Sequence, residues 1–412
     1  MKNTFFKRVV VYVLATTVVS KRINTMCLLA AMTIFGFAIP VLAEDQANGY
    51  LDGYYYFSEN GDTYATDQAY AWYLFEANDD YLLDSELEYL LEELNRRLME
   101  FEPIMPRVEV SIPEGGLGSM LEIEPIDTSH LQTELRYDSL GYSYEVYTDE
   151  SFEWLRAEMM RVANESITPE FEAYVEAISA EVAFLAKQHD AFFEELVAEM
   201  GPSFAKHGVD ISPLLSDHPT LVNTTNMFNR ADGMTYAQIG QMTLIGGAAS
   251  VASAILTGTD SRRGAARHFF WTRRLTLEMG LSNAQILTNN NEFSSIVERQ
   301  RMITPGTTDA QLLAHRIIIH NTAIASLAGF NNVISNDHVM DFWNNRAGAI
   351  SGLTNPNPSQ SEVTLFNNEW SAGRLIRGNQ FSYPVGHPNL PTQLQRNELR
   401  TSFWWTHTFG VL

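Results

Sequence analysis

Cysteine is almost absent from this chain of 412 residues, which contains a single one, Cys27. One cysteine excludes an internal disulfide, and Cys27 lies in an apolar stretch near the start of the chain. The rest of the chain therefore has no thiol nucleophile and no thiolate metal site. Together with the export pattern described below, this lack fits a bacterial periplasm or culture medium better than a eukaryotic secretory route.

Several motifs of common enzyme classes are also missing. The sequence contains no Gly-x-Ser-x-Gly, no P-loop and no dinucleotide-binding glycine pattern. Its ten histidines are scattered, and no His-x-x-x-His pair occurs. His315 and His320 are five residues apart, so they do not stack on one helix face. The sequence therefore predicts no metal site and no cofactor.

Positive charge is scarce in the first half of the chain. Residues 44–235 hold 40 acidic and 9 basic side chains, a net charge of −31. Residues 236–412 hold 13 arginines, no lysine and 10 acidic side chains, a net charge of +3. This change predicts a domain boundary near residues 220–240. The acidic part would repel nucleic acid and anionic lipid, so we expect no nucleic-acid partner. The acidic side chains of residues 44–235 either form a solvated surface or attract the second half of the chain, and the sequence leaves both interpretations open.

The start of the chain resembles an export signal. An apolar run, residues 26–42, follows Lys21 and Arg22 and closes on Ala43, which suits signal peptidase. The run is shorter than the roughly 20 residues of a membrane-spanning helix, so we favour cleavage after Ala43 over an anchor. These features predict a periplasmic or secreted protein with no stable membrane span after cleavage. A second apolar run upstream leaves the true start codon open.

Hydrophobic periodicity predicts a mainly α protein, and its apolar content suffices for two cores. We expect a signal peptide at 1–43, an acidic α+β domain at 44–235, an all-α domain at 236–354 and a loop-rich tail at 355–412 that packs on it. The predicted elements of the acidic domain are hairpins near Asn60-Gly61 and Gly141, strands at 107–112 and 120–124, helices at 80–102, 151–164 and 170–200, and a connector at 201–235. The predicted helices of the second domain are 237–256, 260–279, 282–300, 308–327 and one from 336.

The predicted helix 260–279 carries the first part of a candidate site. His268 follows Arg267, and Trp271 lies one turn beyond them. Because residues three and four apart share a helix face, His268 and Trp271 lie on one stripe. A titratable ring on the inward face of a helix indicates either a functional site or a structural hydrogen-bonding group.

The last predicted helix carries complementary groups. Asp341 is followed by Asn344 and Asn345 at i+3 and i+4. Asp341 can orient the imidazole of His268 or pair with an arginine, and Glu292 on the preceding helix can supply a second carboxylate. These groups are typical of hydrolytic or acyl-transfer chemistry. We assign the residues as follows: catalytic His268, Asp341 and Glu292; substrate-binding Arg267, Trp271, Asn344 and Asn345.

Two motifs in the second half resemble those of an uncharacterised family of exported bacterial domains: Arg267-His268-x-x-Trp271 and Met340-Asp341-x-x-Asn344-Asn345. The resemblance covers roughly residues 258–352. That family has Ala-His-Glu where this chain has Asn290-Asn291-Glu292, and a histidine where it has Trp343. Gly264 also stands where the family tends to have an acid. The resemblance implies a location for a site and no reaction.

Three functional hypotheses follow. The first is an exported hydrolase that acts on a cell-envelope or extracellular polymer, with His268 as general acid or base and Asp341 orienting it. The second is a non-catalytic envelope protein with a degenerate site that binds a partner through its acidic region. The third is an antibacterial effector. A purely structural role is also open, since a buried ion pair braced by amides can hold helices in register.

Overall fold

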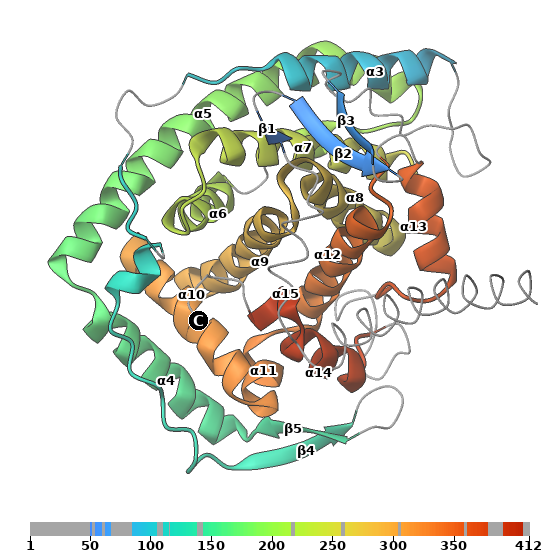
Figure 1. Ribbon diagram of the computed structural model, residues 1–412. Helices are drawn as coiled ribbons and strands as arrows, with labels where there is room; N and C mark the ends of the chain where they lie inside the picture. The colour runs from blue at the N-terminus through green and yellow to red at the C-terminus, as the bar shows by residue number, and fades with distance from the viewer. Residues whose placement is uncertain are drawn as a thin grey trace, which may run out of the picture.

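A computed structural model gives the fold, and it describes residues 50–51, 54–59, 62–66, 85–104, 110–114, 116–137, 143–215, 219–256, 260–303, 306–357, 361–377 and 390–406. The described part is mainly helical, which confirms the predicted class (Figure 1). The predicted signal peptide lies outside the described residues, and the periplasmic or secreted location stays a prediction. Among the described residues, no helix has both the length and the apolar character needed to cross a bilayer.

The elements of the first half include antiparallel strand pairs on either side of the two predicted turns, while Asn60-Gly61 and Gly141 themselves lie outside the described residues. The elements are β1 (Tyr50–Leu51), β2 (Tyr54–Glu59), β3 (Asp62–Thr66), α3 (Ser85–Glu100), η1 (Leu117–Met120), β4 (Thr133–Tyr137), β5 (Ser143–Tyr147), α4 (Asp149–Ser166) and α5 (Pro169–Lys206). Glu59 pairs with Asp62 in one hairpin, and Tyr137 pairs with Ser143 in the other.

The elements described in the second half are all helices. Its elements are η2 (Ser212–Leu214), α6 (Pro219–Ala231), α7 (Tyr236–Ala254), α8 (Asp260–Met279), α9 (Leu281–Ile303), α10 (Asp309–Ala325), α11 (Leu327–Val333), α12 (Asn336–Thr354), α13 (Glu362–Ser371), α14 (Gln393–Thr401) and α15 (Phe403–Thr406). The predicted bounds of α8 are confirmed, and Gly280 beyond its end has φ 80°, as a helix-ending glycine requires.

The predicted strand at 120–124 is wrong. Met120 ends the 3₁₀ helix η1, and the chain that follows is extended without a strand partner. Leu121 is buried and Ile123 packs against the core, while Glu122 is exposed. The alternation that suggested a strand is that of a single extended segment lying on the core. In the other predicted strand, residues 110–112 also form no strand.

Two further expectations differ from the fold because packing outweighs local signals. Helix α5 continues through Pro202, although an interior proline costs about 3 kcal/mol, because fully buried Phe204 anchors its last turn. The predicted connector at 201–235 contains helix α6, which buries Phe228. The described part of the tail includes α13, α14 and α15. As expected, Trp404 and Trp405 of this part lie in the core.

Helices α8, α9 and α12 form the centre of the molecule, and α4 and α5 wrap around the outside (Figure 1). Helices α8 and α12 cross closely. A Cβ at Gly348 of α12 would lie 2.4 Å from the carbonyl oxygen of Phe269 in α8, so only glycine fits there. This close approach brings the chemistry-bearing faces of the two helices together.

Buried side chains from both sides of residue 235 share one hydrophobic core. It extends from Leu87 in α3 to Trp405 in α15. Helix α5 contacts α6 and α7, and helix α4 contacts α10. The division into an acidic domain and a helical domain stays a prediction.

Candidate functional site

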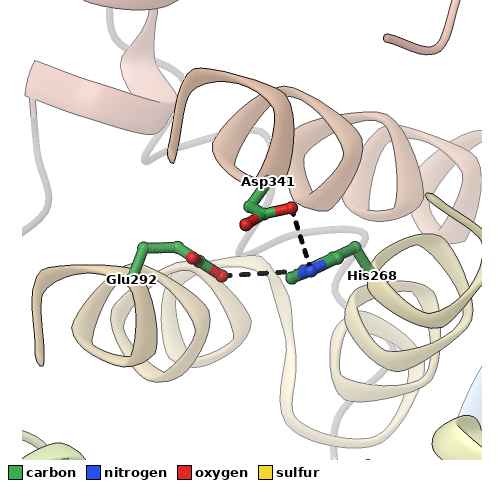
Figure 2. A group of neighbouring side chains, drawn as sticks. All are labelled: His268, Glu292 and Asp341. Atoms are coloured by element: carbon green, nitrogen blue, oxygen red, sulfur yellow. Dashed lines mark ion pairs between the residues drawn. The ribbon is translucent and has the colours of Figure 1, made fainter. Parts of the chain in front are cut away.

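The site is built around His268 on the buried face of α8. The side chain is only 8% exposed, and Thr272 lies one turn further on the same face. The neighbouring helices α9 and α12 supply Glu292 and Asp341, as predicted. Figure 2 shows the imidazole between the two carboxylates.

Both ring nitrogens of His268 have polar neighbours. Nε2 lies 3.1 Å from Oδ1 of Asp341. Nδ1 lies 3.1 Å from Oδ1 of Asn345 and 3.6 Å from Oε1 of Glu292. The sequence prediction that His268, Asp341 and Glu292 come together is therefore met by the geometry.

The hydrogen bonds of Asn345 decide which atoms of His268 carry protons. Asn345 Oδ1 accepts a hydrogen bond from Oγ1 of Thr272 at 2.9 Å, and Nδ2 donates to Oε1 of Glu292 at 3.2 Å. The amide oxygen therefore faces His268, and Nδ1 must donate to it. Nε2 faces a carboxylate oxygen, which also favours a proton there. The surroundings thus favour an imidazolium.

Electrostatics agree with this assignment. Burial alone would lower the pKa of His268, but the charge and hydrogen bonding of Asp341, together with the charge of Glu292, raise it above the ordinary 6.5. For Asp341, burial acts to raise the pKa, but the charge and hydrogen bonding of His268, together with nearby positive charge, outweigh it and the net pKa is lowered. The two groups therefore form an ion pair near neutral pH.

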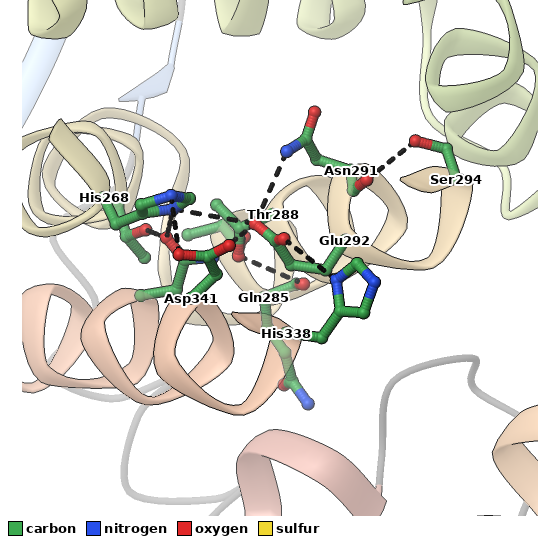
Figure 3. A network of polar contacts seen from close by, with 11 residues as sticks. His268, Gln285, Thr288, Asn291, Glu292, Ser294, His338 and Asp341 are labelled. Atoms are coloured by element: carbon green, nitrogen blue, oxygen red, sulfur yellow. Dashed lines mark hydrogen bonds and ion pairs between the residues drawn. The ribbon is translucent and has the colours of Figure 1, made fainter. Parts of the chain in front are cut away.

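A second layer of polar groups holds Glu292 in place (Figure 3). Asn291 Nδ2 donates to Glu292 Oε1 at 3.4 Å, and His338 Nδ1 lies 4.0 Å from Glu292 Oε2. Asn291 also accepts a hydrogen bond at its backbone oxygen from Ser294 at 2.7 Å. These contacts fix the orientation of the carboxylate that faces His268.

A cavity of about 310 Å³ opens beside this group. Its walls come from α5, η2, α6, α7, α8 and α9, and His268 forms part of the lining. Arg267, which is exposed, and Trp271 line the same cavity. Asp341 and Glu292 do not line it, so they lie behind the imidazole. The arrangement places one imidazole ring between a charged interior and a space for a ligand.

The structure separates the predicted binding residues into three kinds. Arg267 and Trp271 line the cavity, which suits their predicted role. Asn345 instead positions His268 and Glu292. Asn344 is not part of the group, because its amide oxygen accepts from the backbone N–H of Ile376 at 3.1 Å and its Nδ2 donates to the oxygen of the same residue at 3.2 Å. Asn344 therefore ties α12 to the chain that follows α13.

Sequence reasoning missed several residues of the site. Thr272 and His338 could have been found, because each shares a helix face with a predicted residue at a spacing of three or four. Asn226 and His189 line the cavity from α6 and α5. No local signal pointed to them, since their helices meet α8 only through tertiary packing.

The same central groups are of the kinds that bind metal ions. One ligand atom each from His268, Glu292 and Asp341 lies within 4.8 Å of the others. Imidazole nitrogen and carboxylate oxygen are common ligands of divalent transition metals. The same contacts of His268 with two separate carboxylates fit an imidazolium in ion pairs as well as they fit a group of metal ligands.

Comparison with known proteins gave no match: no family model matches the chain, and neither does any curated protein or solved structure. The family resemblance expected from the two motifs stays a prediction. Any proposal for the function of the site therefore depends on the geometry of the site alone.

Proposed function

We propose that this protein is a hydrolase in which His268 transfers protons and Asp341 orients it and stabilises its charge. The observation that carries the proposal is that His268 contacts Asp341 on one side and lines a cavity on the other. A residue placed between a charge partner and a ligand space is the arrangement that general acid–base catalysis needs.

The chemistry can be written for a carbonyl substrate. Neutral His268 keeps its Nε2–H toward Asp341, while Nδ1 leaves Asn345 Oδ1 and accepts a proton from a water molecule whose oxygen bonds to the carbonyl carbon. Asp341 stabilises the imidazolium that forms. The imidazolium then gives this proton to the leaving oxygen or nitrogen as its bond to the carbonyl carbon breaks. His268 ends neutral and ready for another cycle. Glu292, held by Asn345 and Asn291, keeps the ring in place.

The substrate class follows from the predicted export of the chain. We propose a cell-envelope or extracellular polymer, of which a terminal or side group enters the cavity beside Arg267 and Trp271. The division into an acidic α+β region at 44–235 and a helical region at 236–354 belongs to the same proposal. In it, the helical region holds the catalytic group.

The test compares the full chain with His268→Ala on panels of peptidoglycan, lipid and peptide substrates. His130→Ala is the matched control, because His130 is exposed and contacts only the Trp154 ring among the aromatic side chains described. We expect hydrolysis of at least one substrate class by the wild type and the control, and its loss in His268→Ala. Equal activity of all three proteins on every substrate would remove the proposal.

A second candidate is a hydrolase that uses a divalent cation. The specific observation that favours it is the group of three ligand atoms from His268, Glu292 and Asp341. A metal there would polarise the carbonyl oxygen or activate the water. Adding Zn²⁺ or Mn²⁺ to chelator-treated protein should then raise the melting temperature of the wild type and not of Glu292→Gln. No shift in either protein argues for the metal-free reaction.

A further inference from the structure

The cavity beside His268 has apolar side chains in its lining. Phe193, Leu214 and Met242 are among them. Gly247 of α7 also lines the cavity, and Leu214 and Phe193 pack against it, since a Cβ on Gly247 would lie 3.0 Å from Leu214 Cδ2 and 3.4 Å from Phe193 Cε1. Hydrocarbon is the natural partner of such side chains.

The lining also carries hydrogen-bond donors that have no acceptor among the described residues. Asn226 has an exposed fraction of 0%, and neither atom of its amide has a hydrogen-bond partner among the described residues. The Nε1–H of Trp271, whose side chain is 8% exposed, also has no acceptor there. An unsatisfied buried polar group costs about 1–3 kcal/mol, so two of them in one cavity point to a ligand oxygen.

The charges of the lining favour an uncharged ligand. Among the described lining residues, Arg267 is the only lysine or arginine and Asp190 is the only carboxylate. His189 adds no charge near neutral pH, because burial lowers its pKa to about 4. His268 is compensated by Asp341. A free carboxylate or an ammonium group would therefore gain little here.

The size of the cavity limits the ligand. Its volume of about 310 Å³ is roughly twice that of an engineered protein cavity of about 150 Å³ that holds one benzene molecule. About a dozen non-hydrogen atoms fit. This is the size of an acyl group of six to eight carbons (about two atoms per 50 Å³ on the same scale) with its carbonyl and the first atoms of the leaving group.

We propose that the cavity binds the acyl part of an uncharged ester or amide. The carbonyl oxygen accepts hydrogen bonds from Asn226 Nδ2 and Trp271 Nε1, and the hydrocarbon chain packs against Phe193, Leu214 and Met242. This inference rests on the proposed hydrolase function and names its substrate class. Asn226 and Trp271 then act as the donors that stabilise the oxyanion formed when water attacks the carbonyl carbon.

Binding of heptanamide to the full chain, measured by calorimetry, tests the inference without any need for catalysis. We expect the wild type to bind, and Asn226→Leu and Trp271→Phe each to weaken binding about tenfold, the usual effect of one lost hydrogen bond in a buried site. Thermal unfolding of each variant confirms that it is folded.

A pair of glycine substitutions provides a matched control within two helices. In Gly246→Ala the new Cβ lies 3.4 Å from Trp271 Nε1 and covers this donor. In Gly264→Ala the new Cβ meets nothing within 4 Å. Both changes favour helix, so both variants fold. We expect Gly246→Ala to weaken heptanamide binding about tenfold, as Trp271→Phe does, and Gly264→Ala to bind it like the wild type.

The outcomes separate this inference from the proposed function. If the wild type does not bind heptanamide, or if all variants bind it equally, the acyl site is wrong even where another substrate is hydrolysed. If heptanamide binds with the expected pattern but no ester or amide of that acyl group is hydrolysed, the acyl site stands and the hydrolase is wrong. His268→Ala should keep most of the binding while hydrolysis is lost.

Discussion

At the scale of single residues, His268 differs from three other buried histidines. Burial lowers the pKa of His189, His315 and His320 to about 4, so these rings are neutral. His268 is buried too, yet its pKa is raised because Asp341 and Glu292 face it. Two carboxylates therefore outweigh desolvation at this one ring. A raised pKa of a buried histidine occurs at functional sites, and structural ion-pair networks produce it as well.

Glu278 of α8 provides a test of buried charge outside the site. Its burial raises the pKa to about 7, although Gln241 Nε2 donates a hydrogen bond to it at 2.7 Å. The folded state therefore holds a proton between pH 4.5 and 7 that the unfolded state releases. Stability from this group is present below pH 4.5 and falls as the pH rises through this window.

We predict that Glu278→Gln removes this pH-dependent loss of stability. The free energy of unfolding of the variant should exceed that of the wild type by an amount that grows from pH 4.5 to 7 and reaches up to about 3 kcal/mol. Denaturant unfolding at several pH values measures it. Exposed Glu88→Gln is the control and should show no such trend. A constant difference between variant and wild type over this range contradicts the assignment.

At the scale of elements, the crossing of α8 and α12 positions the site. We predict that Gly348→Ala lowers the free energy of unfolding by at least 1–3 kcal/mol, because its Cβ would lie 2.4 Å from the backbone oxygen of Phe269 and must push the helices apart. Thermal unfolding measures this effect. Gly264→Ala, which meets no neighbour, should unfold at or above the wild-type temperature. Equal stability of the two variants would mean that the helices do not cross this closely.

The sequence predicted those elements whose signals are local. The bounds of α8 followed from a capping residue and Gly280, and the stripe through His268 followed from helical periodicity. The same reasoning placed Asp341 on a helix face with Asn345. It failed for α6, because Asn and Thr residues resemble a loop, and for the end of α5, because burial of Phe204 outweighs Pro202. The cavity was out of reach, since it exists only where α5, α6 and α7 pack against α8.

At the scale of the whole molecule, the C-terminal tail completes the core. Trp405 of α15 has an exposed fraction of 0% and lies between α9 and α12, with ring centroids 5.4 Å from Phe293 and 4.9 Å from Phe342. Its backbone oxygen lies 2.8 Å from Nε2 of His320. The helices that carry Glu292 and Asp341 are therefore held together partly by residues far along the chain.

We predict that Trp405→Ala lowers the free energy of unfolding by about 3–5 kcal/mol, the usual cost of removing a buried large aromatic side chain. Leu394→Ala on α14 is the control, because Leu394 is 72% exposed and should change stability by less than about 0.5 kcal/mol. Chemical denaturation measures both. A small effect of Trp405→Ala would show that the tail does not complete the core.

The most direct test of the account is the pH dependence of kcat/KM for hydrolysis of a heptanoyl ester by the wild type and Asp341→Asn. For the wild type, we expect activity to rise through a pKa above 6.5, as His268 loses its proton and becomes the base. For Asp341→Asn, the rising part of the pH profile should move to lower pH, because burial then dominates the pKa of His268 and lowers it. The maximal kcat/KM should also fall. If the pH profiles of Asp341→Asn and the wild type coincide, Asp341 does not support proton transfer by His268, and the account is contradicted.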